Sequence, residues 1–224
     1  MFFLKKNTYS IINNHTVETF IHAYAHKDNW HNLNTEKGNL GYGWIHYAFI
    51  RNLTPSTILT IGSRYGFIPA ICALACKDNR KGKVYFVDAN YDQSDSKQTN
   101  NWGGVGFWTK KNIKKQFDAF KLTPYIKTHI MTTDRFFQNH QHIRWGYIHI
   151  DGDHSYTGVK MDFMHSWDQL IPGGIIALHD IHTNQQHNPP YGVQKLWLEL
   201  KKSRQYNMFE LPGAYGLGFI QKNE

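Results

Sequence analysis

The sequence has few cysteines and no long hydrophobic run. Its 224 residues include only two cysteines, Cys72 and Cys76, too few for the disulfide framework of a small secreted domain. They lie four residues apart in an apolar helical stretch, which favours buried structural thiols over a metal or redox pair. No 18 consecutive apolar residues occur, so no membrane span is expected. The apolar start Met1–Leu4 precedes its lysines, unlike a signal peptide. These absences favour a cytoplasmic protein.

Low-complexity tracts and internal repeats are absent as well, and the composition is that of a folded protein, with 41% hydrophobic and 15% aromatic residues. The formal net charge of +8 is compatible with an anionic partner, such as nucleic acid, a sugar nucleotide or a phosphorylated lipid surface. However, the lysines are scattered along the chain, and a solvated surface explains them equally well. Charge alone therefore does not select a partner.

Strand-like and helix-like segments alternate through most of the chain. Five β-prone runs, each followed by a helical pattern, are 57–61, 83–87, 125–131, 147–150 and 174–178. Two last strands, 207–211 and 215–221, are joined by a Pro-Gly-Ala turn that makes one of them antiparallel. The pattern predicts an α/β fold: a doubly wound, mostly parallel, seven-stranded sheet with a terminal antiparallel hairpin.

The first 54 residues precede this alternation. Helices are predicted over 16–27 and 44–53, separated by a polar, turn-rich loop (29–43) that we expect near the functional site. We therefore expect one structural domain, in which an N-terminal helical cap region (1–54) covers part of an α/β region (55–224).

Acidic and histidine side chains follow two neighbouring strands. Asp151-Gly152-Asp153-His154 comes after the fourth strand, and His179-Asp180 after the fifth. Between them, Ser155 can cap a helix whose inward apolar residues are Val159, Phe163, Trp167 and Leu170. Both parallel strands point their carboxyl ends at one sheet edge, where open α/β sheets bind ligands.

A glycine turn, Gly62-Ser63-Arg64-Tyr65-Gly66, follows the first strand, and Asp88 ends the second. Such a turn lets backbone N–H groups and a helix N-terminus face a ligand, and an acid at the second tip suits the hydroxyls of a ribose. Together they predict a ribonucleoside cofactor. The spacing G-x-x-x-G differs from G-x-G-x-x-G, which argues against a dinucleotide.

The order of these motifs, with Ile-Gly-Ser-Arg-Tyr-Gly, Val-Asp, Asp-Gly-Asp-His-Ser-Tyr and Pro-Gly-Gly before His-Asp, resembles the class I S-adenosylmethionine-dependent methyltransferases. Within them it is most similar to the metal-dependent small-molecule O-methyltransferases, which include sugar and macrolide-type enzymes. The resemblance implies a Rossmann-like methyltransferase fold, methyl transfer to a small hydroxylated substrate, and these cofactor-binding residues: Gly62, Ser63, Tyr65, Gly66, Asp88, Thr133, Asp134 and Asp151.

The same resemblance implies a divalent metal held by Asp151, His179 and Asp180, and Asp153 as general base. Mg²⁺ prefers carboxylates, whereas imidazole suits zinc, iron or nickel. Magnesium, manganese, and a metal-free site in which His154 or His179 acts as base therefore stay open. Asp153 and His154 are the candidate catalytic residues.

Several alternatives remain at this point. Thr60 stands where the resembled family usually carries an acid, which motivates a non-catalytic cofactor-binding subunit. The D-G-x-H pattern is also found in cephalosporin-hydroxylase-like enzymes. Asn188-Pro189-Pro190-Tyr191 spells the base-gripping motif of nucleic-acid N-methyltransferases, but it follows the fifth strand rather than the fourth, and we interpret it as a loop. Trp102 and Trp108 suit either an aromatic lid or a packed cluster. The methyl acceptor and the oligomeric state, a homo-oligomer included, are open.

Overall fold

The computed structural model describes residues 14–25, 28, 30–34, 38–90, 106–183, 191–213 and 215–223. Its helices are α1 (Asn14–Tyr24), α2 (Tyr42–Leu53), α3 (Phe67–Asn79), α4 (Lys110–Lys115), α5 (Thr133–Asn139), α6 (Tyr156–Gln169) and α7 (Val193–Ser203), with a 3-10 turn η1 (Thr123–Tyr125). Its strands are β1 (Thr57–Ile61), β2 (Lys83–Asp88), β3 (Ile126–Ile130), β4 (Trp145–Ile150), β5 (Leu170–His179), β6 (Asn207–Leu211) and β7 (Leu217–Gln221).

The strands form one seven-stranded sheet in the order β3-β2-β1-β4-β5-β7-β6. Strands β1 to β5 are parallel, and β7 runs antiparallel to both β5 and β6. The predicted doubly wound sheet with a terminal antiparallel hairpin is confirmed. The central strands β1 and β4 are buried on both faces, as expected where helices cover both sides.

The boundaries of two predicted elements are corrected. Leu170 belongs to β5 and pairs with Trp145, because its backbone is extended directly after α6 (φ −72°, ψ 132°). The last strand begins at Leu217, since Tyr215 and Gly216 have left-handed backbone angles (φ 61° and 77°) that close the turn from β6.

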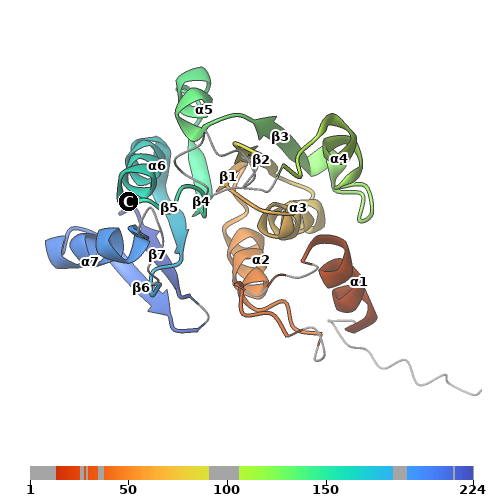
Figure 1. Cartoon of the computed structure of the whole chain (residues 1–224), viewed down its shortest axis with the longest axis horizontal. Coiled ribbons are helices and arrows are strands. Elements are labelled where there is room, and N and C mark those ends of the chain that lie inside the picture. Colours follow the sequence, from red (N-terminus) through yellow and green to blue (C-terminus); the bar gives the residue numbers. More distant parts are fainter. Residues whose placement is uncertain are drawn as a thin grey trace, which may run out of the picture.

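Two hydrophobic cores lie on opposite faces of the sheet. Helices α1, α2 and α3 pack on one face, where Phe20, Ile50 and Phe86 are buried, whereas α5, α6 and α7 cover the other with Phe136, Phe163 and Trp197. Figure 1 shows these two groups of helices on either side of the sheet. In the parts of the chain that the structure describes, no helix is long and apolar enough to cross a membrane.

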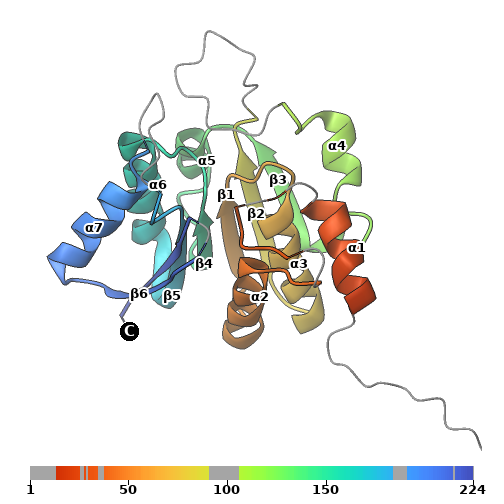
Figure 2. The ribbon, with the colours of Figure 1, turned by 60° about the horizontal axis from the view of Figure 1, so that its bottom comes forward.

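The carboxyl ends of β1, β2, β4 and β5 lie at one edge of the sheet, since these strands are parallel and in register. Figure 2 shows the strands β1 to β4 side by side, with α1, α2 and α3 in front. The segment 30–34 before α2 reaches this edge, where the Trp30 carbonyl oxygen lies 3.1 Å from Nε2 of His179. The candidate site is built from these strand ends and this segment.

Candidate active site

The glycine turn after β1 brings two strand ends together. The Gly62 N–H donates to the Val87 carbonyl oxygen (2.9 Å), and the Asp151 N–H donates to that of Ile61 (2.9 Å). Gly62 has φ 75°, and a Cβ there would lie 2.0 Å from the Asp151 carbonyl oxygen. Only glycine permits this approach. The turn after β1 is therefore packed directly on the turn after β4.

The same turn prepares the start of α3. Gly66 precedes the helix with φ 91°, and its N–H donates to the Ser63 hydroxyl at 3.1 Å. Tyr65 lies beside it, with its ring edge-on to Phe107 at 5.2 Å. The turn thus leads into the N-terminus of α3. Backbone N–H groups at a helix N-terminus attract polar or negatively charged ligand atoms.

Asp88, at the end of β2, is buried against this turn. One carboxylate oxygen accepts the Ser63 N–H (3.1 Å) and the other accepts the Asn90 N–H (2.6 Å). Burial raises the pKa of Asp88 to about 6, while these two backbone hydrogen bonds oppose the rise. The carboxylate is thereby fixed beside the glycine turn.

Aromatic residues close the other side of the turn. The Trp108 indole N–H donates to the Ser63 carbonyl oxygen (3.1 Å), and its ring lies 4.8 Å from Phe86 and 5.9 Å from Phe117. Trp108 is therefore part of a packed cluster, which was one of the two interpretations of its sequence. Trp102 lies outside the described residues.

The predicted adenine-side residues lie at the start of α5. The Asp134 carboxylate accepts a hydrogen bond from the Gln138 amide one turn along the helix (2.9 Å). Thr133 lies close to Asp162, whose buried carboxyl has a pKa raised to about 7, chiefly by burial. The assignment of Thr133 and Asp134 to the adenine stays a prediction.

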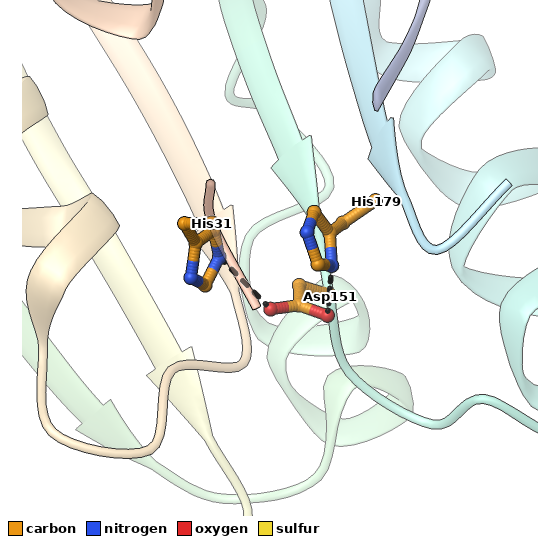
Figure 3. Close-up of side chains that lie close together, drawn as sticks. All are labelled: His31, Asp151 and His179. Carbon is orange, nitrogen blue, oxygen red and sulfur yellow. Dashed lines mark ion pairs between the residues drawn. The ribbon is translucent and has the colours of Figure 1, made fainter. Parts of the chain in front are cut away.

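Asp151, directly after β4, is at the centre of a cluster of histidines. Nε2 of His154 lies 3.0 Å from its Oδ1, and Nδ1 of His179 lies 3.5 Å from the same oxygen. Nε2 of His31 lies 3.6 Å from Oδ2. Figure 3 shows His31 and His179 flanking the carboxylate. Burial alone would raise the pKa of Asp151, but the surrounding imidazoles hold it well below its usual value.

Asp180, directly after β5, extends this cluster. Its carboxylate lies 3.2 Å from Nδ1 of His179 and 3.3 Å from Nε2 of His154. Its backbone is left-handed (φ 63°), a conformation that non-glycine residues adopt at a cost of about 1 kcal/mol or more and that clusters at functional sites. Burial lowers the pKa of His179, but Asp180 and Asp151 outweigh it and raise that pKa well above its usual value.

The two candidate catalytic residues differ in position. The Asp153 carboxylate accepts the Ser155 N–H (2.8 Å) and lies against Gly158, at the start of α6 rather than among the clustered histidines. His154 lies between Asp151 and Asp180, and its ring stacks on Tyr191 at 5.0 Å. Asn188, Pro189 and Pro190 of the N-P-P-Y motif lie outside the described residues.

Two members of the site could not be identified from any pattern in the sequence. His31 and Asp28 lie in the polar segment before α2, which we expected near the site only as a loop. In the structure, Nδ1 of His31 is 2.7 Å from the Asp28 carboxylate, and its ring stacks on His179 at 4.5 Å. No spacing in the sequence relates His31 to Asp151, because tertiary packing alone brings them together.

Thr60, the residue in place of the expected acid, is buried in β1. Among the described residues its hydroxyl oxygen has no hydrogen-bond partner. The backbone contacts of the glycine turn and Asp88 form without an acid at this position.

These features define a class of protein: a doubly wound α/β fold with a glycine turn after the first strand, beside a cluster of acids and histidines. Residues 59–181, more than half of the chain, match the family described as Methyltransferase domain. The chain belongs to this family.

Solved structures share the fold. The O-methyltransferase TomG from Streptomyces achromogenes, in complex with SAM, has a TM-score of 0.62 at 12% identity, over 95% of this chain and 92% of that one. The O-methyltransferase from Bacillus cereus, in complex with SAH, has 0.59 at 15% identity, over 95% and 93%. The SAH-bound methyltransferase PaMTH1 from Podospora anserina has 0.62 at 15% identity, over 98% and 92%. No curated protein matches the chain in sequence.

Proposed function

We propose that the protein is an S-adenosylmethionine-dependent O-methyltransferase that acts on a small hydroxylated substrate, with a sugar or sugar nucleotide favoured over a phenol. One observation carries the proposal: the contact of Gly62 with the Asp151 carbonyl oxygen places the glycine turn beside the acid–histidine cluster. Structural likeness to O-methyltransferases that contain SAM or SAH supports it.

The residues around the glycine turn are chemically suited to bind S-adenosylmethionine. Gly62, Ser63, Tyr65 and Gly66 would line the methionine end, and Asp88 would hold the ribose hydroxyls with its fixed carboxylate. S-adenosylmethionine supplies an electrophilic methyl group on its sulfonium. The chain's own contribution is to hold the acceptor oxygen in line behind that methyl group and to exclude water.

Deprotonation of the acceptor would fall to the cluster. We assign a divalent cation to Asp151, His179 and Asp180, where it would lower the pKa of a nearby hydroxyl. His154 is better placed than Asp153 to accept the proton, because Asp151 and Asp180 flank its Nε2 whereas the Asp153 carboxylate is engaged by the Ser155 N–H. The predicted Asp153 base is retained as the alternative.

The predicted cap region (1–54) and α/β region (55–224) have different roles in this proposal. The cap contributes Asp28 and His31 to the site, and α1 and α2 share a hydrophobic core with α3. We propose that the cap shapes the acceptor pocket. An anionic acceptor is consistent with the formal charge of +8.

Transfer of a labelled methyl group to a panel of sugars, sugar nucleotides and phenols tests the proposal. Asp151→Asn should lower kcat by on the order of 10²- to 10⁴-fold, the range for losing an acid–base or metal-activated step. Asp168→Asn, on the exposed face of α6, is the matched control and should leave kcat unchanged. Unchanged turnover of Asp151→Asn would overturn the assignment. Absence of S-adenosylmethionine binding in calorimetry would favour a non-catalytic subunit.

A further inference from the structure

We propose that His31, Asp151 and His179 form a two-histidine, one-carboxylate site that takes a borderline transition-metal ion, such as Zn²⁺, Fe²⁺ or Co²⁺, in preference to Mg²⁺. The inference rests on the metal part of the proposed function, but it changes both the ligands and the metal. It makes His31, from the N-terminal cap, a ligand.

The spacing of the three side chains suits one ion. The ligand atoms of His31, Asp151 and His179 all lie within 4.8 Å of one another, and the two nitrogen–carboxylate distances are 3.6 and 3.5 Å. Ligands about 2.1 Å from a metal lie roughly 3.0 to 3.4 Å apart in octahedral or tetrahedral geometry. The three side chains would therefore have to move closer together to complete the site, and each of the two nitrogens already lies near one oxygen of Asp151.

The outer nitrogen of each imidazole is already held by an oxygen. Nδ1 of His31 lies 2.7 Å from the Asp28 carboxylate, and Nε2 of His179 lies 3.1 Å from the Trp30 carbonyl oxygen. Each outer nitrogen is thereby turned away from Asp151, and the inner nitrogen of each ring is turned toward it, where a metal ion would take the place of a proton. Metal-binding histidines are commonly oriented in this way, by an oxygen that accepts a hydrogen bond from the ring nitrogen that does not bind the metal.

The inner nitrogens face carboxylates, with Nδ1 of His179 at 3.2 Å from Asp180 and 3.5 Å from Asp151. Nε2 of His31 and Nδ1 of His179 are both buried, and neither makes a hydrogen bond to any described residue. Each of these nitrogens lies close to a carboxylate, so a cation among the three groups, a proton or a metal ion, offsets the buried negative charge. Protonating both rings would place two imidazolium ions 4.5 Å apart in a buried stack, which Coulomb repulsion opposes. One divalent ion serves all three groups.

The donor set decides which ion. Two imidazole nitrogens and one carboxylate suit zinc, iron, cobalt or nickel. Mg²⁺, by contrast, prefers oxygen ligands and usually keeps several of its water molecules. The neighbouring Asp151, His154 and Asp180 offer a second, oxygen-richer triad that shares Asp151. Occupation of the first triad would leave His154 free of the metal as a proton acceptor.

Titration of the metal-free protein with Co²⁺, followed by the visible absorption of bound cobalt, tests the site without any assay of turnover. Wild type should bind one Co²⁺, displaced by Zn²⁺ but not by millimolar Mg²⁺. His31→Gln should weaken Co²⁺ binding by at least about 100-fold. This exceeds the 10- to 100-fold loss of affinity that is typical when a residue hydrogen-bonded to a metal ligand is removed. His165→Gln, whose ring stacks on Phe137 away from the site, is the matched control and should bind as wild type does.

Two further variants sharpen the result. Asp28→Asn removes the carboxylate charge that faces Nδ1 of His31 and should weaken Co²⁺ binding by about 10-fold. His31→Asp replaces the nitrogen by oxygen and should shift preference from Co²⁺ toward Mn²⁺ and Mg²⁺. Equal melting temperatures of all variants in EDTA would show that the losses do not come from unfolding.

The outcomes separate this inference from the proposed function. If His31→Gln binds Co²⁺ as tightly as wild type while Asp180→Asn does not, the inference fails and the metal belongs to the Asp151, His179 and Asp180 set. If wild type binds no Co²⁺, protons alone occupy the cluster and the inference fails too. Methyl transfer that persists with EDTA would leave the methyltransferase proposal intact in that case.

Discussion

The two halves of the ligand-binding edge differ in how their polar groups are satisfied. At the ends of β1 and β2, both Asp88 oxygens accept backbone N–H groups, and the Ser63 carbonyl oxygen accepts the Trp108 indole. At the ends of β4 and β5, His31 and His179 present buried nitrogens without hydrogen-bond partners among the described residues. The polar groups named in the first half are satisfied by the protein alone, whereas the second half is where we propose a cation.

This difference has a physical reason. Backbone groups near a strand end are satisfied by neighbouring strands and turns, so a nucleoside site can be formed by the fold itself. Buried imidazoles and carboxylates are satisfied only by each other or by an ion, and a half-satisfied buried network destabilises the fold. The acid–histidine half therefore depends on what binds to it.

The largest effect on the free energy of unfolding is expected from a substitution at the contact between the two halves. Gly62→Ala would place a Cβ 2.0 Å from the Asp151 carbonyl oxygen, so we expect a loss of about 3 kcal/mol or more in the free energy of unfolding. Gly173→Ala is the matched control: its φ is 73°, but an added Cβ meets no described atom within 4 Å, so about 1 kcal/mol of backbone strain is expected. Urea unfolding measures both. Equal losses would mean that the two halves do not depend on this contact.

Asp162, a buried residue of α6, lies close to Gly152, which follows Asp151, and provides a test by pH. Its carboxyl has a pKa raised to about 7 from 3.8, mainly by burial, so the folded state binds more protons than the unfolded state between these values. Stability from this group therefore falls as pH rises from about 4 to about 7. Asp162→Asn has no ionisable side chain at this position, so its stability should not show this fall with pH. Relative to wild type, it should gain about 2 kcal/mol between pH 5 and pH 8 in urea unfolding; parallel pH profiles of the two proteins would contradict the burial of an ionisable carboxyl there.

The smallest effect is expected at the first half alone. Asp88→Asn loses the charge that would hold ribose hydroxyls and one of the two oxygens that accept backbone N–H groups, so the Kd for S-adenosylmethionine should rise about 10-fold. Co²⁺ affinity should not change, because the second half is untouched. Calorimetry with each ligand checks both statements. A loss of cobalt binding in this variant would show that the halves are coupled rather than independent.

The alternation of apolar strands and amphipathic helices was enough to predict the sheet and its terminal hairpin. It also placed Gly62, Asp88, Asp151 and Asp180 at strand ends, because parallel strands in a doubly wound sheet must present their carboxyl ends at one edge. Boundaries were less accurate. The start of β5 at Leu170 depends on pairing with Trp145, which a helical apolar pattern does not reveal.

The site itself divides along the same line. Local sequence determined which side chains follow each strand, since connectivity alone carries them to the edge. Tertiary structure decided that His31 stacks on His179, that Asp28 fixes His31, and that Asp153 is bound to the start of α6 while its neighbour His154 is held between two carboxylates. Those contacts join residues far apart in the chain or choose among side-chain orientations, and only packing of the N-terminal segment and α6 against the finished sheet determines them.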